Sequence, residues 1–412
     1  MPVGAFRGTV LIVLSLMIVG PAGPALGQEP AVPEVLSTFT RRIPITLDNS
    51  AGAALSNWPV VLPATSLEAV ATDLNLANCA LAAQDADGQW NAIPYQVDEI
   101  DEAVGRELSF LASVPAEAQG TYYLYYNPEG RRSSVFMLKT RTAQDWVPPN
   151  IGWESALIAY RTYHGQFDFF AKKMTGGPGP AAETYILPTI GDKDYHKEAE
   201  WGMDPLLVGR SSGIGGLTLY LGEQGYRLQN PEGQGSVRFD KEVLAVGAVR
   251  AAVEVTVGDF VPGNRDVTAR ITCLIYGGHQ ESEIRVSVMG APEGALPAPG
   301  LTKLPTEETC FDREKGYFGN WGQQNIEIGP IGMALLLPPG LALDPIEADG
   351  DHRVPCPLSD GVLRYHILGD WMRSRVYATA PGIAQWQERL EALAAELSRE
   401  VPVAVGTVET LG

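Results

Sequence analysis

Apolar and polar residues alternate with a period of two over long stretches of this chain. An apolar residue occupies every second position from Val249 to Val257 and again from Val267 to Ile275. The same alternation runs from Ile284 to Val288. A period of two with one apolar side is typical of antiparallel strands that pack on one face. The pattern therefore predicts a mainly β fold.

The polar side of these three predicted strands carries Arg250, Arg270 and Arg285. One interpretation is an outer face of the sheet that is simply solvated. The other is a concave face that binds carbohydrate. The alternation itself does not choose between them.

The predicted strands group into two β domains followed by a helix. Short strands separated by turn residues predict an N-terminal β-sandwich over residues 32–135. A larger antiparallel domain, similar to the supersandwich of polysaccharide lyases and sugar mutarotases, is expected over residues 150–412. Pro381 and an apolar stripe from Ile383 to Leu397 predict a C-terminal amphipathic helix over about residues 381–399.

The first 27 residues have the pattern of a secretory signal peptide. Arg7 precedes an apolar run from Val10 to Val19, and small residues end at Gly27. The run is too short to span a bilayer. We therefore expect a periplasmic or secreted protein without a membrane anchor.

The net charge of -19 narrows the choice of partners. Nucleic-acid binding needs a clustered basic surface, so a nucleic-acid partner is not expected. An anionic oligosaccharide remains compatible with the charge, because a local arginine cluster can outweigh the global field.

Four cysteines, at positions 79, 273, 310 and 356, permit three disulfide pairings. Export would favour disulfides. Cys273 lies on the apolar side of a predicted strand, where a buried free thiol is equally consistent. There is no CxxC and no HExxH motif, so we predict neither a metal nor a cofactor.

A glycine-rich stretch, GRSSGIGG at residues 209–216, does not fit a nucleotide site. No Gly-Lys-Ser/Thr follows it, and Thr218 occupies the place of the third glycine of a dinucleotide fingerprint. GRSSG, residues 209–213, has the spacing of a GxSxG elbow, but the residues after it alternate like a strand and predict no helix, which argues against acyl transfer. The glycines instead predict a bend or a close approach of two backbones.

Two segments are denser in functional groups than folding requires. The candidate residues in residues 153–173 are Glu154, Tyr160, Arg161, His164, Asp168 and Lys172, and those in residues 194–204 are Tyr195, His196, Glu198, Trp201 and Asp204. Histidine and tyrosine can transfer protons, and arginine and lysine can neutralise a carboxylate. Each residue taken alone also has an ordinary structural interpretation.

These residue types favour β-elimination on a uronate-containing oligosaccharide, by a lyase or a dehydratase. His196 with Tyr160 or Tyr195 would transfer protons, and Arg161 would bind the carboxylate of the substrate. The other candidates would bind the substrate. Lys172 would pair with the carboxylate of the uronate, and Trp201 would stack on the sugar ring. Polar contacts would come from Glu154, His164, Asp168 and Asp204. One alternative is a glycoside hydrolase that uses Glu154, Glu198 and the two aspartates as paired carboxylates. The other is a non-catalytic periplasmic glycan-binding protein.

Three blocks of the chain resemble a bacterial family known only as a domain of unknown function. They are GWESALIAYRTYHGQFDFFAKK, DYHKEAEWGMDPLLVGRSSGIGG and YHILGDWMRSR, together with an "IPxQ"-like strand in IPYQVDEIDEAVGRELSF, residues 93–110. The stretch TYHGQFDFF departs from the more polar sequence expected in relatives. The resemblance implies an exported protein of polysaccharide-degrading bacteria and a carbohydrate-active role, with dehydration of uronic-acid oligosaccharides as the associated activity.

Overall fold

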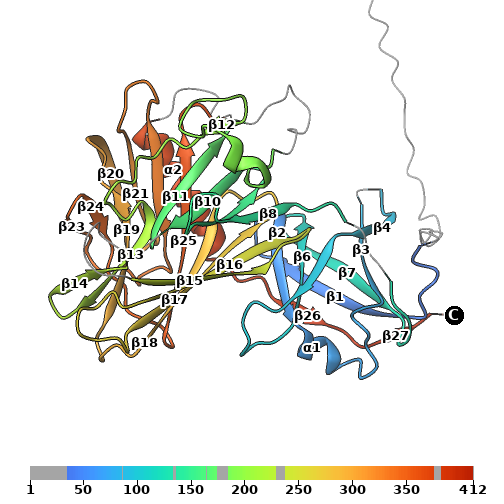
Figure 1. The fold of residues 1–412 in the computed structure, drawn as a ribbon. Helices are drawn as coiled ribbons and strands as arrows, with labels where there is room; N and C mark the ends of the chain where they lie inside the picture. The colour runs from blue at the N-terminus through green and yellow to red at the C-terminus, as the bar shows by residue number, and fades with distance from the viewer. Residues whose placement is uncertain are drawn as a thin grey trace, which may run out of the picture.

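The computed structural model describes residues 35–85, 87–132, 136–163, 165–173, 184–228, 237–374 and 382–411. The predicted signal segment and His164 lie outside these ranges. Within them antiparallel sheets dominate, and the predicted mainly β class is confirmed. Figure 1 shows a larger part, which carries helix α2, beside a smaller part formed by the first strands and the last ones.

The smaller part is a sandwich of two sheets. Its first sheet consists, in spatial order, of β26 (Val403–Val405), β1 (Arg41–Asn49), β7 (Ala118–Tyr126), β3 (Cys79–Gln84) and β4 (Trp90–Ile93), with β27 (Glu409–Thr410) also pairing with β1. Its second sheet consists of β2 (Leu55–Pro63), β6 (Glu107–Val114) and β5 (Tyr95–Asp98), and the short helix α1 (Ala64–Glu68) follows β2. Apolar residues of both sheets, among them Ile45, Leu81, Phe110 and Leu124, form the core between them.

The C-terminal end of the chain returns to its beginning. Thr46 of β1 pairs with Ala404, and Arg42 pairs with Glu409. The terminal strands thus belong to the first sheet, although they follow the helix in sequence. The alternation in so short a segment did not predict this.

The larger part contains three sheets that face each other across one core. The first of them is β12 (Gly202–Met203), β11 (Gln166–Lys172), β10 (Ile158–Tyr163), β9 (Ile151–Ser155) and β8 (Thr140–Gln144). The second is β14 (Gln224–Arg227), β13 (Ile214–Leu221), β19 (Leu296–Thr302), β24 (Asp351–Arg353) and β23 (Ile346–Ala348). The third has eight strands: β15 (Arg238–Ala245), β16 (Arg250–Gly258), β17 (Thr268–Tyr276), β18 (Ser282–Met289), β25 (Val362–Trp371), β22 (Ile331–Leu336), β21 (Tyr317–Gln323) and β20 (Thr306–Asp312).

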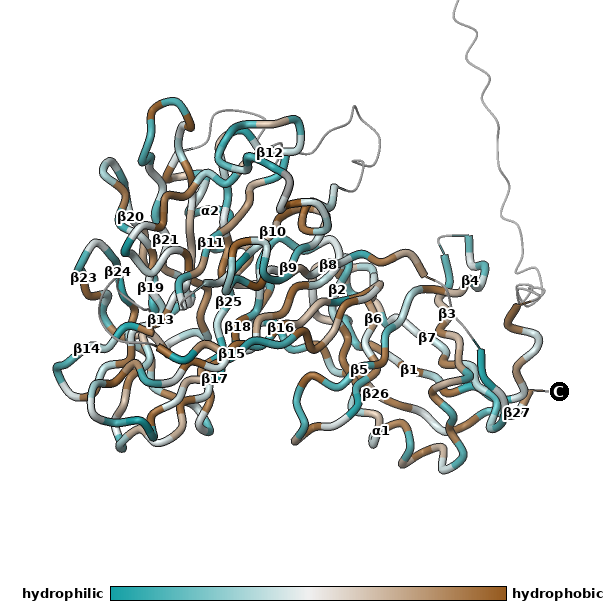
Figure 2. Tube along the Cα trace, in the orientation of Figure 1, coloured by the Kyte–Doolittle hydropathy of each residue, from teal (hydrophilic) through white to brown (hydrophobic). Residues whose placement is uncertain are grey.

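The predicted alternating strands form the centre of the eight-stranded sheet. Their apolar positions, such as Val253, Ile271 and Val286, are buried against Trp153 and Phe167 of the facing sheet. Figure 2 shows hydrophobic colour along these strands and hydrophilic colour at many of the turns. Burying one face of each strand is the main favourable contribution to this packing.

Helix α2 (Ile383–Leu397) covers the outer face of the eight-stranded sheet near β20, β21 and β22. Trp386, Leu390 and Ala394 are buried, as the apolar stripe predicted. The side chain of Gln385 accepts a hydrogen bond from the backbone N–H of Gly382 and so satisfies one free donor at the N-terminal end. The helix is slightly shorter than predicted, and Pro381 lies outside the described residues.

Arg250 corrects the prediction that all three arginines lie on a solvated or sugar-binding face. Its side chain is fully buried where the two parts of the molecule meet, and it donates to Asp98 and, at 2.7 Å, to Glu107. Gln96 accepts from the backbone N–H groups of Val249 and Arg250 and donates to the carbonyl of Arg250, each at 3.1 Å. The strand that contains IPYQ therefore connects the smaller part to β16.

Arg270 and Arg285 do lie at the outer surface of the sheet. Arg270 pairs with Glu254 at 2.6 Å, and Arg285 pairs with Glu283 at 2.7 Å. These ion pairs fit the solvated interpretation of this face.

All four cysteines are buried free thiols, so none of the three permitted disulfide pairings occurs in this structure. Burial raises the pKa of Cys79 and of Cys356 to about 12, which makes both thiols poor nucleophiles.

No helix in the described ranges is long and apolar enough to cross a membrane. Export stays a prediction.

Replacing Arg250, the buried cation at the junction, should lower the free energy of unfolding. Arg250→Ala leaves Asp98 and Glu107 without their shared partner, and we expect a loss of about 3–5 kcal/mol in the free energy of unfolding. Arg270→Ala is the matched control, because that ion pair is partly exposed and contributes about 0–1 kcal/mol. Urea denaturation of both variants checks this, and equal losses would contradict it.

Candidate functional site

A pocket of about 430 Å³ opens beside the ends of β10 and β11. Its walls come from three segments: residues 147–150, the two strands, and the loop of residues 195–209. The lining residues are Val147, Pro148, Pro149, Asn150, Arg161, Tyr163, Asp168, Tyr195, His196, Leu206, Leu207, Val208 and Gly209. Apolar walls with a few convergent polar groups are typical of a small-molecule site.

Arg161 is the central polar residue of this pocket. It pairs directly with Asp168 across the β10–β11 register, so the two side chains lie on the same face. Its Nε and Nη2 atoms donate to Oδ2 of Asp168 at 3.0 and 2.6 Å, and Nη2 also donates to Oδ2 of Asp204 at 2.9 Å. Arg161 is 6 % exposed, and both aspartates are buried. The two predicted aspartates thus share one guanidinium.

Proton affinity differs between the members of this group. Burial raises the pKa of Asp204 well above its ordinary 3.8, and the nearby charge of Asp168 raises it further. Burial also raises the pKa of Asp168, although the Arg161 guanidinium opposes that shift. For Arg161, burial lowers the pKa, but the two carboxylates outweigh it and the net shift is upward. The arginine stays charged, and burial favours the protonated form of both carboxyl groups, most strongly at Asp204.

His196 lies at the mouth of the pocket with Asp204 behind it. Its Nδ1 is 3.6 Å from Oδ2 of Asp204, and its side chain is 54 % exposed. The ring of Tyr195 lies 4.6 Å from the His196 ring, and the Arg161 guanidinium lies 5.0 Å from the Tyr195 ring centre. A hydrogen bond from the Asp204 backbone N–H to the Tyr195 carbonyl, at 2.8 Å, fixes the two ends of this loop together.

The glycine-rich stretch forms a close approach of two backbones beside the pocket. Gly213 has a φ of +69°, and an added Cβ would lie 1.7 Å from the carbonyl oxygen of Phe167. Gln166 Nε2 donates to the carbonyl of Gly209 at 2.7 Å. The predicted bend is therefore confirmed, and its effect is to place the loop against β11.

Tyr160, a predicted proton-transfer residue, does not line this pocket. Its side chain is fully buried and its hydroxyl donates to the carbonyl of Gln280 at 2.8 Å. The same oxygen accepts from the backbone N–H of Gly369 at 3.2 Å. Burial raises the pKa of this hydroxyl above its ordinary value. The geometry gives Tyr160 a place in the core rather than at the pocket.

Lys172 and Glu154 form a separate buried ion pair of 2.5 Å. Glu154 also accepts from the backbone N–H groups of Ile186 and Leu187, at 3.0 and 2.9 Å. Lys172 donates to two backbone carbonyls in addition. This pair fixes the start of the 3₁₀ helix η1 (Leu187–Asp192) and does not line the pocket.

Trp201 and Glu198 also lie outside the pocket lining. Trp201 packs on Phe170 with a centroid separation of 6.4 Å, within the small apolar cluster that also contains Tyr195. Glu198 pairs with Lys173 and Arg373. Both residues belong to the loop that carries His196, but neither lines the pocket.

Asn150 is the pocket residue that the sequence did not predict. It is 1 % exposed, and both polar atoms of its amide have no hydrogen-bond partner within the part of the chain that the structure describes. A buried amide without partners costs stability, so such groups are rare in folded proteins. Its place in the pocket lining suggests that a ligand completes it. The only sequence signal was its position directly after Pro148-Pro149 in a connector.

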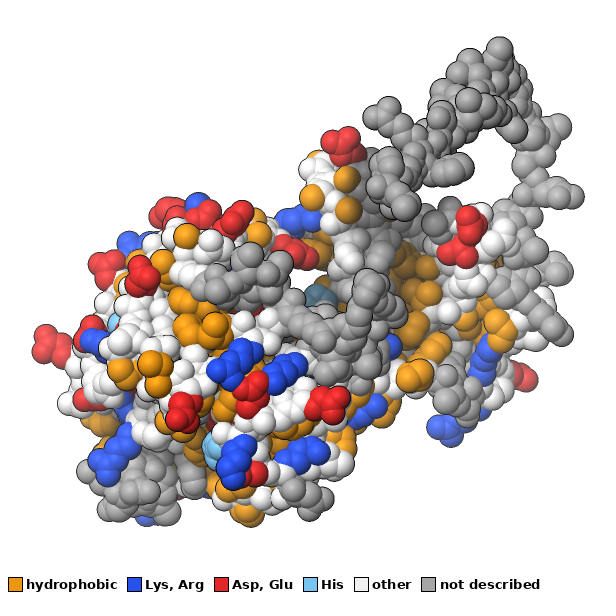
Figure 3. All heavy atoms as spheres, turned by 90° about the horizontal axis from the view of Figure 1, so that it is seen from above, with side chains coloured by type: hydrophobic (Ala, Val, Ile, Leu, Met, Phe, Trp, Pro, Cys, Tyr) orange, Lys and Arg blue, Asp and Glu red, His pale blue; other side chains and the backbone are white. Residues whose placement is uncertain are grey.

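No group of histidine, cysteine, aspartate and glutamate side chains among the described residues has metal-binding geometry. Acidic and basic side chains are interspersed over the face shown in Figure 3.

The sequence matches DUF4861, a domain of unknown function, over residues 47–403. The chain belongs to this family. The resemblance derived from its sequence blocks is thereby confirmed. Among curated proteins the comparison finds no match.

The fold of this DUF4861 chain is similar to that of a solved structure. A protein of glycosyl hydrolase family 38 from Enterococcus faecalis is similar over 89 % of this chain, with a TM-score of 0.51 and 9 % identity. An alpha-mannosidase from Enterococcus faecalis V583 has a TM-score of 0.49 and 10 % identity over 89 % of this chain. The match covers 47 % and 46 % of those two chains, so the DUF4861 chain spans about half their length. At such identity the likeness shows the fold alone.

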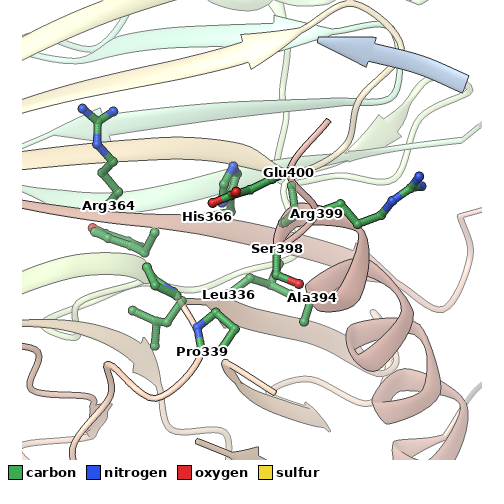
Figure 4. Close-up of a pocket in the computed structure, with 12 residues that line it drawn as sticks. Leu336, Pro339, Arg364, His366, Ala394, Ser398, Arg399 and Glu400 are labelled. Atoms are coloured by element: carbon green, nitrogen blue, oxygen red, sulfur yellow. The ribbon is translucent and has the colours of Figure 1, made fainter. Parts of the chain in front are cut away.

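A second pocket, of about 360 Å³, lies between the end of α2, β25 and residues 337–339. Figure 4 shows His366 on β25 together with Ser398 and Glu400, which follow the helix, whereas the side chain of Arg364 extends away from them. None of the predicted site residues lines it. It is therefore distinct from the pocket at Arg161.

Asp204 should make the stability of this DUF4861 chain depend on pH. Its raised pKa means that the folded protein keeps a proton that the unfolded chain releases above about pH 4. Stability therefore falls as the pH rises from there through the folded pKa. In Asp204→Asn this decline should flatten, because the variant cannot take up that proton. Urea denaturation at a series of pH values measures both slopes, and an unchanged slope would show that Asp204 is not the titrating group.

Proposed function

We propose that this protein is a carbohydrate-active enzyme and that the pocket at Arg161 is its active site. The reaction proposed is β-elimination on a uronate-containing oligosaccharide. The fold shared with a glycosyl hydrolase family 38 structure supports the substrate class by analogy. The reaction class is argued from the pocket itself.

The observation that carries the proposal is the exposed His196 imidazole backed by the buried Asp204 carboxyl. Imidazole is the commonest general base in enzymes, and the Asp204 carboxyl group beside Nδ1 can orient the ring. Arg161 and Asp168 in turn fix the position of Asp204. Nε2 of His196 is then the atom available to a substrate.

Elimination needs a base that removes a proton and an acid that protonates the leaving group. His196 takes the proton from the carbon next to the carboxylate, the C–O bond at the following carbon breaks, and the electron pair forms a carbon–carbon double bond. Tyr195 returns a proton to the leaving oxygen, which departs as water or as a sugar hydroxyl.

The roles of two predicted residues change in this arrangement. The Nε and Nη2 donors of Arg161 already bond to the aspartates, so it acts here as a positioning residue. Asn150, with its two unpaired polar atoms, takes the role of a substrate-binding residue. A sugar hydroxyl can both donate to and accept from such an amide.

Hydrolysis is the second candidate, because the site holds two carboxyl groups, Asp168 and Asp204. A retaining glycoside hydrolase uses such a pair as acid and nucleophile at a separation of about 5–5.5 Å, whereas these two hydrogen-bond each other. Both are buried behind Arg161, however, whereas His196 is open to the pocket. The elimination reading therefore fits the exposed groups better.

Replacing His196 should abolish turnover without unfolding the protein. Removal of a general base typically costs a factor of about 10²–10⁴ in rate, and the His196 side chain contributes little to the core. The assay follows the ultraviolet absorbance of an unsaturated uronate and, in parallel, the release of reducing ends from the same oligosaccharides. Lys197→Ala, the exposed neighbour, is the control.

Ultraviolet absorbance that disappears in His196→Ala and persists in Lys197→Ala is the expected result. Reducing ends released without ultraviolet absorbance would select hydrolysis. Binding of oligosaccharides without any turnover would leave the protein a binding protein.

Asn150 should affect substrate binding more than stability. Asn150→Ala removes two unpaired buried polar atoms, so the free energy of unfolding should stay the same or rise. The lost contact should raise KM about tenfold, with kcat little changed. Steady-state kinetics and urea denaturation measure the two effects. A clear loss of stability would show that the amide has a structural partner.

A further inference from the structure

The outer face of the first sheet carries a row of aromatic side chains. In β3, Ala82 pairs with Tyr123 of β7, and Gln84 pairs with Trp90 of β4. Tyr125 continues the row two residues beyond Tyr123. The residues between them on β7 point into the sandwich core, so this row lies on the side away from it.

Trp90 is held in a defined orientation. Its ring lies 4.8 Å from the Tyr123 ring at an interplanar angle of 64°. The Arg42 guanidinium lies 4.0 Å from the centre of the Tyr123 ring, and its Nε donates to Glu409 at 2.6 Å. Arg42 and Trp90 thus both fix Tyr123. A ligand that stacks on Trp90 would meet a side chain that is already ordered, which lowers the entropy cost of binding.

Trp90 and Tyr123 line a wide groove of about 830 Å³. Exposed polar residues, namely Gln84, Ser113, Gln119 and Thr121, lie along the same groove. Within the described residues, neither the indole N–H of Trp90 nor the hydroxyl of Tyr123 has a hydrogen-bond partner, although both rings are half-buried. The groove therefore combines an ordered aromatic face with free donors and acceptors.

We propose that this groove is a second, non-catalytic site that binds a chain of pyranose sugars. A pyranose ring has an apolar face of C–H groups, which stacks on an aromatic ring, and a rim of hydroxyls, which need donors and acceptors. A purely apolar partner would leave the polar groups of the groove unpaired, at a cost in free energy.

The two sites lie in different parts of the molecule. The groove is lined by β3, β4 and β7 and by the ends of β2 and β6, all in the smaller part, whereas the pocket at Arg161 belongs to the larger part (Figure 1). The choice of a sugar as the ligand rests on the proposed function, but the groove residues take no part in the proposed elimination. A long glycan bound in the groove would raise the local concentration of substrate at the pocket.

The experiment titrates the full-length protein with hexasaccharides of mannose, of glucose and of galacturonate. Binding is followed by calorimetry and by tryptophan fluorescence. Trp90→Ala should weaken binding of at least one hexasaccharide about tenfold or more, whereas Trp58→Ala, which alters a half-buried tryptophan of β2 outside the groove, should not. His196→Ala should bind as the wild type does, which separates this site from the catalytic one.

A second variant tests the groove independently in case Trp90→Ala does not fold. Thr121→Arg places a long side chain in the groove from an exposed position and should weaken binding as strongly. The proposal is overturned if no hexasaccharide binds to the wild type, or if binding survives both groove variants. It is also overturned if Trp90→Ala abolishes a concentration-dependent dimer instead, because the groove would then be an interface between two copies of the chain.

Discussion

One buried cation determines the geometry of the candidate active site. Arg161 is almost completely removed from water, and its charge is compensated by Asp168 on the paired strand and by Asp204 on the following loop. Burying an arginine is favourable only when such partners surround it. Because Asp204 comes from the loop that also carries His196, the ion pairs place that histidine at the pocket. The same burial raises the proton affinity of Asp204, so the positioning contacts also set the electrostatics behind His196.

A second buried arginine connects the two parts of the molecule. Arg250 at the start of β16 pairs with Asp98 and Glu107, and Gln96 bonds to the backbone beside it. A glutamine side chain can satisfy backbone donors and acceptors that lose their strand partners at such a junction. The return of the last strands to β1 adds a second connection, and the groove at Trp90 is lined by the same sheet together with the ends of β2 and β6.

The fold was largely predictable because its signals are local. Alternation around Val253, Ile271 and Val286 depends only on neighbouring residues, and so does the apolar stripe of the helix. The site was predictable in part for a related reason. Arg161, Asp168, His196 and Asp204 belong to two dense polar segments that fold against each other. Tyr160 and Lys172 share those segments, but whether a polar side chain on a strand points to the pocket or to the core depends on what the facing sheet places opposite it.

The sequence by itself determined the β class, the central strands, the helix and the blocks that identify the family, because period and residue type are properties of short segments. Only the tertiary structure decided which charges are buried, that all four thiols stay apart, and that Asn150 lines the pocket with an amide that has no hydrogen-bond partner among the described residues. The physical reason is that burial and pairing depend on contacts between residues far apart in the chain. The alternation around Arg250 and Arg270 is the same, yet the first is fully buried at a junction and the second is half exposed in a surface ion pair.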